Sequence, residues 1–285
     1  MSEPEASGKH RRAEPAPRPA ASPAVQHLVV RYAKRGKMRF ASHRDVARAF
    51  ERGVRRAALP IAYSAGFTPH PKISYAGGAP TGVASEAEYL SLALTSRQPA
   101  TEVRHRLNAV LPDGIDVVDV TEDAGSNGKL PSGSAANLSS LEASEWRVEL
   151  PGVRPEAAAR AVDGFLARRE APVERRTDKA VRHLDARAPV IEMNVVEMNV
   201  VETDVIADSV PADPDRGHRA AGTGGIDPED CAILRMVVLH TAPAVRPEDV
   251  LTALRSGHGI APSSPPLTTR LAQGSRTSLA GKNVS

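Results

Sequence analysis

The chain repeats one order of predicted elements, and this repetition is the strongest constraint on its fold. In residues 26–122 the hydropathy pattern predicts a strand, a helix, two strands, a helix and a strand. The same order follows, less regularly, in residues 141–272. The order β-α-β-β-α-β is typical of a ferredoxin-like sandwich, in which two helices cover one face of an antiparallel sheet. We therefore expect an α+β protein of two tandem ferredoxin-like units.

Local signals define the elements of the first unit. An apolar run from His27 predicts the first strand, and Ser42 with Asp45 predicts the N-terminal cap of a helix. In chain order, the expected elements after the first strand are a helix at 42–57, extended pieces at 59–63 and 72–76, a strand at 86–95, a helix at 99–111 and a strand at 115–120.

The second unit contains an interruption. Its expected elements are a strand at 145–150, a helix at 155–168, extended pieces at 173–176 and 181–191, a strand at 231–240, a helix at 247–256 and a strand at 267–271. Residues 192–229 form an acidic insertion that begins with three similar pentads. A period of five fits neither a helix nor a strand, so we interpret the pentads as a local duplication in a surface loop. Residues 1–25 and 273–285 are expected to be disordered tails, and 123–140 a linker.

The chain has a single cysteine, Cys231. One thiol excludes a disulfide framework, and it excludes an iron–sulfur cluster or a multi-thiolate zinc site built by this chain alone. The N-terminal segment lacks the apolar core of a signal peptide, and no apolar run is long enough to span a bilayer. We therefore expect a soluble, cytoplasmic protein without membrane contact.

Charge is distributed unevenly, although the net charge is only +3. Residues 28–57 carry ten Lys or Arg against two acidic residues, whereas residues 192–230 carry ten acidic residues against two arginines. Four arginines on the predicted helix 42–57 lie at spacings of four, four and three, and form one stripe: Arg44, Arg48, Arg52 and Arg55. Because guanidinium forks match phosphate geometry, the stripe predicts an RNA- or nucleotide-binding surface. The alternative is a solvated polar face.

Aromatic residues are concentrated around this helix. Seven of the nine in the chain lie between Tyr32 and Tyr89. Aromatic side chains beside a basic groove can stack on bases, so Tyr32 and Phe40, together with Arg39, extend the predicted nucleic-acid surface. The signature of an RNA-recognition motif is absent from the sequence.

A second group of residues has the chemistry of an acid–base site. His70 lies between two prolines, which restrict its backbone, so it is suited to act as an acid, a base, a ligand or a packing corner. His43 begins the basic helix, and Glu86 and Glu88 point to the same side of one strand. These residues could complete a carboxylate–histidine site, but nothing in their spacing requires them to meet. The loop Gly77–Gly82 lacks the lysine of a P-loop, and we interpret it as a turn.

The segment 39–94 resembles the radical-SAM-linked proteins, a domain family of unassigned function (DUF2344). The shared features are Arg39-Phe40, Ser42-His43, Phe50-Glu51-Arg52, Gly66-Phe67, Pro69-His70-Pro71, Gly82, Ser85-Glu86 and Glu88-Tyr89. Asp185-Ala186-Arg187 and Val245-Arg246-Pro247 also fit, so the resemblance extends over roughly residues 27–256.

The resemblance implies that this protein is a partner of a radical S-adenosylmethionine enzyme. Members of the family occur fused behind a cobalamin-binding radical enzyme domain or as separate chains, often encoded close to a ribonuclease of the E/G type. This chain has no CxxxCxxC motif, so it would be the stand-alone form and would hold no cofactor. The separate enzyme would carry the iron–sulfur cluster and S-adenosylmethionine.

We therefore expect a non-catalytic accessory module that binds RNA or a nucleotide-bearing substrate. One alternative is an enzyme that uses His43, His70 and either Glu86 or Glu88, with or without a metal, although we assign no metal ligand. Another alternative is a structural module for protein–protein interaction.

Overall fold

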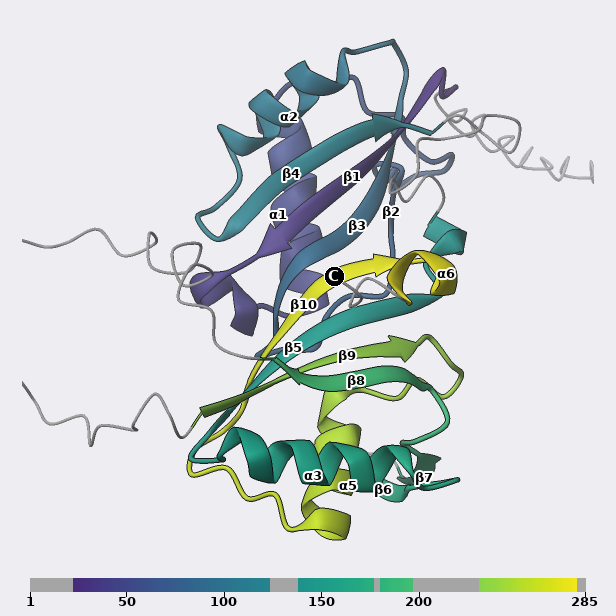
Figure 1. The fold of residues 1–285 in the computed structure, drawn as a ribbon. Coiled ribbons are helices and arrows are strands. Elements are labelled where there is room, and N and C mark those ends of the chain that lie inside the picture. Colours follow the sequence, from purple (N-terminus) through teal and green to yellow (C-terminus); the bar gives the residue numbers. More distant parts are fainter. Residues whose placement is uncertain (1–22, 124–137, 177–179, 197–230, 281–285) are drawn as a thin grey trace, which may run out of the picture.

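The computed structural model describes residues 23–123, 138–176, 180–196 and 231–280 (Figure 1). These residues form a mixed α+β structure with ten strands and five α-helices. Eight of the strands belong to one largely antiparallel sheet, in the order β4-β1-β3-β10-β5-β9-β8, with β2 paired to β3. No helix among the described residues combines the length and the apolar character needed to cross a bilayer.

The first half of the chain follows the predicted order of elements. It contains β1 (Gln26–Lys34), η1 (Gly36–Phe40), α1 (His43–Arg56), β2 (Ile73–Tyr75), β3 (Ala84–Leu94), α2 (Ala100–Asn108) and β4 (Ile115–Glu122). The predicted cap of α1 is confirmed, because Ser42 and Asp45 each accept a hydrogen bond from the backbone amide of the other. The extended piece expected at 59–63 is not a strand and makes only two isolated bridges, at Ile61 and Tyr63.

The second half differs more from the prediction. It contains η3 (Leu138–Ser140), β5 (Ala143–Pro151), α3 (Pro155–Leu166), β6 (Pro172–Arg176), β7 (Val181–Asp185), β8 (Val190–Val196), β9 (Cys231–Leu239), α5 (Pro247–His258), β10 (Leu267–Gly274) and α6 (Arg276–Leu279). The expectation of one extended piece at 181–191 is wrong, because the chain turns at 186–189. Pro189 in this turn has no amide hydrogen to donate to a strand ladder. The strands on either side of this turn belong to different sheets: β7 pairs with β6, and β8 pairs with β9.

Two expected boundaries also need correction. The acidic insertion does not begin at residue 192, because Glu192–Val196 continue β8 along β9. The remainder of the pentads, 197–206, lies outside the described residues. The C-terminal tail does not begin at residue 273, because β10 continues to Gly274 and α6 follows it. Leu279 of α6 is 3% exposed and packs against Ala143 and Val237, which explains why this segment is structured.

Strand β10 joins the two halves of the chain into one sheet. It lies beside β3 in parallel and beside β5 in antiparallel orientation (Figure 1). The two predicted units therefore do not have separate sheets. We call the line of contact between β3 and β10 the seam.

Each half has its own hydrophobic core between the sheet and a pair of helices. In the first half the fully buried Phe50 of α1 meets Tyr32 of β1 edge-on, with ring centroids 4.7 Å apart. In the second half Trp146 of β5 and Phe165 of α3 belong to the same cluster as Leu254 of α5. Full burial of one such side chain contributes roughly 1.5–3 kcal/mol. The seam lies between these two cores.

Candidate nucleic-acid interface and a buried charged cluster

Helix α1 separates an apolar face from a basic face. Its buried residues are Val46, Ala49, Phe50, Gly53 and Val54, at the spacing of one helix face. The four arginines that the sequence placed in one stripe, Arg44, Arg48, Arg52 and Arg55, are all exposed. We call these four residues the arginine stripe.

Few neighbouring groups neutralise the arginine stripe. Within the described chain, no carboxylate forms an ion pair with Arg44, Arg48 or Arg52. The Arg55 side chain donates from Nε to the backbone oxygen of Glu51, at 3.0 Å, rather than to its carboxylate. Hydrogen bonds from the Ser42 side chain and backbone hold the pKa of Asp45 below its ordinary value, so this nearby carboxylate is engaged in the helix cap. As far as the described residues go, these three guanidinium groups are open to an anion.

The aromatic residues near the stripe have different accessibility. Phe40 is 66% exposed, and the Arg39 guanidinium lies 5.4 Å from its ring centroid. Phe67 is 77% exposed. The sequence analysis named it among the features shared with the family but not as a binding residue. Tyr32 is 3% exposed, so the expectation that it stacks on a base is wrong. Alternation along β1 turns it towards the core together with Leu28.

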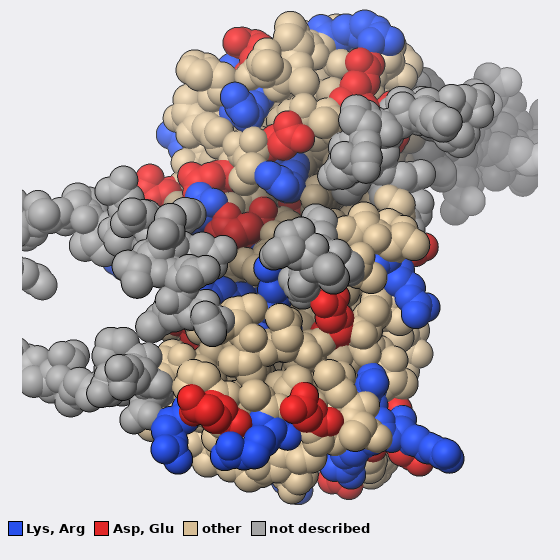
Figure 2. Space-filling model, in the orientation of Figure 1, with Lys and Arg blue, Asp and Glu red and all other residues tan. Residues whose placement is uncertain are grey.

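The stripe lies away from the face seen in Figure 2. In Figure 1 helix α1 runs behind β1 and β3. The face turned to the viewer in the same orientation carries Lys and Arg side by side with Asp and Glu (Figure 2). A polyanion would meet charges of both signs on this face, whereas the arginine stripe presents one sign of charge.

The structure does not bring the four predicted acid–base residues together. Glu86 forms an ion pair with Arg35. His70 is exposed, and its backbone amide donates to Ser64 Oγ at 3.1 Å. Among the described residues, no group of three His, Cys, Asp or Glu side chains is placed to hold a metal ion.

The other two members of that group, His43 and Glu88, both lie next to Gly78. A Cβ atom on Gly78 would be 3.1 Å from His43 Cδ2 and 3.6 Å from Glu88 Oε2. The His43 ring also contacts Tyr75 edge-on, with ring centroids 5.3 Å apart. The first residue of α1 therefore packs against the glycine-rich loop, directly beside a buried carboxylate.

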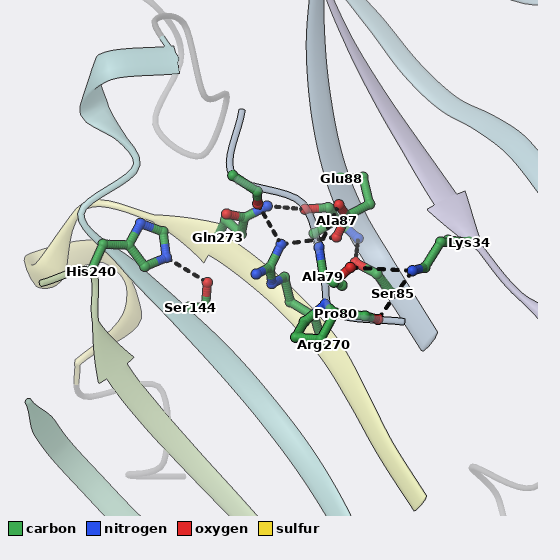
Figure 3. Close-up of polar contacts among 11 residues, drawn as sticks. Lys34, Ala79, Pro80, Ser85, Ala87, Glu88, Ser144, His240, Arg270 and Gln273 are labelled. Atoms are coloured by element: carbon green, nitrogen blue, oxygen red, sulfur yellow. Dashed lines mark hydrogen bonds and ion pairs between the residues drawn. The ribbon is translucent and has the colours of Figure 1, made fainter. Parts of the chain in front are cut away.

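A charged cluster lies at the seam, and we call it the seam cluster: Lys34, Glu88 and Arg270 (Figure 3). These three residues are 3%, 3% and 6% exposed. Arg270 Nη1 donates to Glu88 Oε1 at 2.9 Å and to the backbone oxygen of Gly77 at 3.0 Å. The Arg270 guanidinium also lies 4.6 Å from the ring centroid of Trp146. The sequence analysis missed this cluster because Arg270 and Glu88 are 182 residues apart.

The seam cluster holds the loop Gly77–Gly82 through its backbone. Lys34 Nζ donates to the carbonyl oxygens of Ala79 and Pro80, both at 3.3 Å, and the amide of Ala79 donates to Glu88 Oε2 at 3.0 Å. At the end of the loop Arg39 Nε donates to the oxygen of Gly82 at 2.8 Å. Burial lowers the pKa of Lys34, an effect that Glu88 opposes. The loop is thus more than the simple turn that the sequence suggested.

A serine–histidine contact lies on the other side of β10. The distance between Ser144 Oγ and His240 Nε2 is 2.6 Å, and His240 Nδ1 lies 2.7 Å from the oxygen of Leu141 (Figure 3). If Nδ1 carries the proton and donates to that oxygen, Nε2 accepts from the serine hydroxyl. Ser144 is 1% exposed, so its hydroxyl is not open to a substrate. We interpret this pair as a packing contact.

Comparison with known families places the chain among proteins without an assigned role. The model of the family DUF2344, described as an uncharacterized protein conserved in bacteria, matches residues 27–247. A search of curated proteins finds no match. The matched region includes the arginine stripe, the glycine-rich loop and β1, β3 and β5, but ends before β10.

Proposed function

This chain belongs to the DUF2344 family, and from that premise we propose that it is a stand-alone accessory module of a radical S-adenosylmethionine system that binds RNA or a nucleotide-bearing substrate. The association with a radical enzyme rests on the resemblance carried by residues 39–94. The binding of a nucleic acid rests on the surface of α1.

The arginine stripe is the observation that carries the proposal. Residues four apart on a helix are about 6 Å apart along its axis, so Arg44, Arg48 and Arg52 can follow the phosphates of one extended strand. Each guanidinium is exposed and makes no ion pair within the described chain, so binding a phosphate breaks no existing salt bridge. The exposed ring of Phe40 is placed just before the helix, where base stacking contributes roughly 1–3 kcal/mol per base.

We also infer that each half of the molecule is a ferredoxin-like unit. The strand orders β4-β1-β3-β2 and β10-β5-β9-β8 support this inference, because each matches the order 4-1-3-2 with two crossover helices. In this interpretation the β6–β7 hairpin is an insertion into the second unit.

The positions of the predicted acid–base residues favour binding over catalysis. His70 contacts the loop around Ser64, Glu86 pairs with Arg35, and Glu88 is buried beneath the glycine-rich loop. A general base must reach the proton that it abstracts, and these residues do not converge on one open position.

The proposal is tested by reversing the charge of the stripe. The variant Arg44→Glu/Arg48→Glu/Arg52→Glu should lose retention of single-stranded RNA on a filter, while its circular dichroism spectrum stays unchanged. A matched control makes the same change of charge in the second half at three exposed arginines that form no ion pair with another described residue: Arg160, Arg169 and Arg182. The control should retain RNA. Equal retention by all three proteins, or equal loss in both variants, would remove the α1 surface from the proposal.

The association with a radical enzyme needs a separate test. Tagged protein purified from its native cells under anaerobic conditions should bring down an enzyme that carries an iron–sulfur cluster, identified by mass spectrometry and by the cluster's absorbance. The Arg160, Arg169 and Arg182 control should behave in the same way. Recovery of RNA without any such enzyme would leave RNA binding in place and reject the radical-enzyme partner.

A further inference from the structure

The seam buries more positive than negative charge. Lys34 and Arg270 are almost completely buried, and the half-buried Arg39 holds the far end of the same loop. In the part of the chain that the structure describes, Glu88 is the one carboxylate that forms an ion pair with any of these three cations. Within the described residues, two of these three cations, Lys34 and Arg39, therefore have no ion-pair partner. A buried cation is unfavourable unless it is paired, so this excess calls for an anion.

Two donors in the cluster are poorly satisfied. Arg270 is 6% exposed, and its buried Nε has no hydrogen-bond partner among the described residues. Among the described residues, Lys34 Nζ donates to two neutral carbonyl oxygens, both at 3.3 Å, which is long for a hydrogen bond from an ammonium group. Both side chains contact backbone oxygens of the same loop, Arg270 through Nη1 and Lys34 through Nζ (Figure 3).

The loop Gly77–Gly82 meets these donors through its backbone. It touches the cluster through the carbonyls of Gly77, Ala79 and Pro80 and through the Ala79 amide, and no side chain of the loop takes part. Glycines at three of its six positions widen the accessible backbone conformations, and Gly82 has a φ of +89°. Gly77 and Gly78 are exposed. The carbonyl oxygens of the loop accept hydrogen bonds from Lys34 Nζ and Arg270 Nη1. The oxygens of a bound anion would take the same positions.

We propose that Lys34, Arg39 and Arg270 form a binding site for a phosphoryl group, and that the loop Gly77–Gly82 moves aside when this group enters. The charge selects the ligand: the two uncompensated positive charges match a phosphate monoester, which carries close to two negative charges at neutral pH, better than a single carboxylate. The side chain of His43, at the start of the 14-residue helix α1, lies against Gly78, so the positive end of that helix dipole lies near the same loop.

This site is distinct from the arginine stripe and does not depend on the proposed binding of RNA. The stripe follows the exposed side of α1, whereas the phosphoryl site lies under the loop at the seam. The phosphoryl group can belong to a nucleotide or be free phosphate, and the choice of probe separates these sources.

Isothermal titration calorimetry with AMP, inorganic phosphate and adenosine tests the site. The unmodified protein should bind AMP or phosphate but not adenosine, and tighter binding of AMP than of phosphate identifies a nucleotide as the source. Lys34→Met, which keeps the volume and removes the charge, should weaken binding roughly tenfold or more without loss of folding. Arg44→Gln/Arg48→Gln/Arg52→Gln should bind these probes like the unmodified protein, even if it no longer binds RNA. Loss of AMP binding in this variant alone would move the site to the stripe and overturn the proposal.

If Lys34→Met does not fold, a second variant and a second measurement still test the site. Arg39→Gln, at a half-buried position, should also weaken binding of phosphate. Hydrogen exchange of the Ala79 amide should become faster when phosphate is added, because the moving loop releases this amide from Glu88. A cluster that serves only to hold the loop would show no binding of AMP or phosphate at millimolar concentration and no change in exchange. Either of these results would overturn the proposal.

Discussion

Replacing Glu88 by glutamine should destabilise the protein far more than the same change at Glu86. The two residues lie on one strand and differ in burial: the side chain of Glu88 is 4% exposed and faces Arg270 at 7%, whereas those of Glu86 and Arg35 are 32% and 35% exposed. Removing one partner of a buried ion pair leaves the other charge uncompensated and costs about 3–5 kcal/mol. A partly exposed pair is worth about 0–1 kcal/mol.

These energies convert into a difference in melting temperature. A domain of this size loses roughly 2–4 °C per kcal/mol, so Glu88→Gln should melt roughly 6–20 °C below the unmodified protein, and Glu86→Gln at most about 4 °C below it. Thermal unfolding followed by circular dichroism, checked by urea denaturation, measures both shifts. The change keeps the size of the side chain, so cavities do not contribute.

A double variant then tests the cause of the loss. Without Glu88 the seam contains two buried cations, and Lys34→Met removes one of them. Lys34→Met should therefore recover part of the stability lost in Glu88→Gln, while it changes the stability of the unmodified protein little. Equal melting temperatures for Glu88→Gln and Glu86→Gln, or a further loss in the double variant, would refute the electrostatic reasoning.

Two further predictions concern alkaline pH and the C-terminal segment. Burial raises the pKa of Tyr32, Tyr75 and Tyr89, so above the ordinary value of 10.0 the folded state binds more protons than the unfolded state, and the free energy of unfolding should fall as pH rises further. Burial lowers the pKa of Lys34 and of Arg270, which act in the opposite sense, and we expect the three tyrosines to dominate. Tyrosinate absorbance that develops fully without unfolding would contradict this. Leu279→Ala should cost about 2–5 kcal/mol in urea denaturation because Leu279 is 3% exposed, whereas Leu267→Ala at 44% exposure should cost little. Equal effects would mean that α6 does not contribute to the core.

The first half of the fold could be predicted because its signals are local. Ser42 and Asp45 are three residues apart and define the start of α1, and the alternation of apolar residues defines β1. The arginine stripe follows from helical spacing alone. Its exposure could be predicted for the same reason, since the apolar face of α1 fixes the opposite face.

The seam could not be predicted because it depends on contacts between distant segments. Strand β10 meets β3 at only two paired positions, Thr269 with Ala84 and Arg270 with Ser85. No local sequence pattern predicts the pairing of β10 with β3. The sequence analysis counted Lys34 among the ten basic residues of 28–57, because the charge of a residue does not reveal that it is 3% exposed. Lys34, which was counted with that basic segment, is therefore part of the internal seam cluster.

The salt dependence of RNA binding tests the proposed role of α1 most directly. For single strands the slope of log affinity against log salt concentration changes by about 0.7 for each phosphate contact. Fluorescence anisotropy with a labelled single-stranded RNA over a series of salt concentrations should therefore give a slope for Arg44→Gln/Arg48→Gln/Arg52→Gln that is shallower by about 2. Arg160→Gln/Arg169→Gln/Arg182→Gln should leave the slope unchanged. The same slope in the stripe variant and in the unmodified protein would contradict the proposal that these arginines contact RNA phosphates.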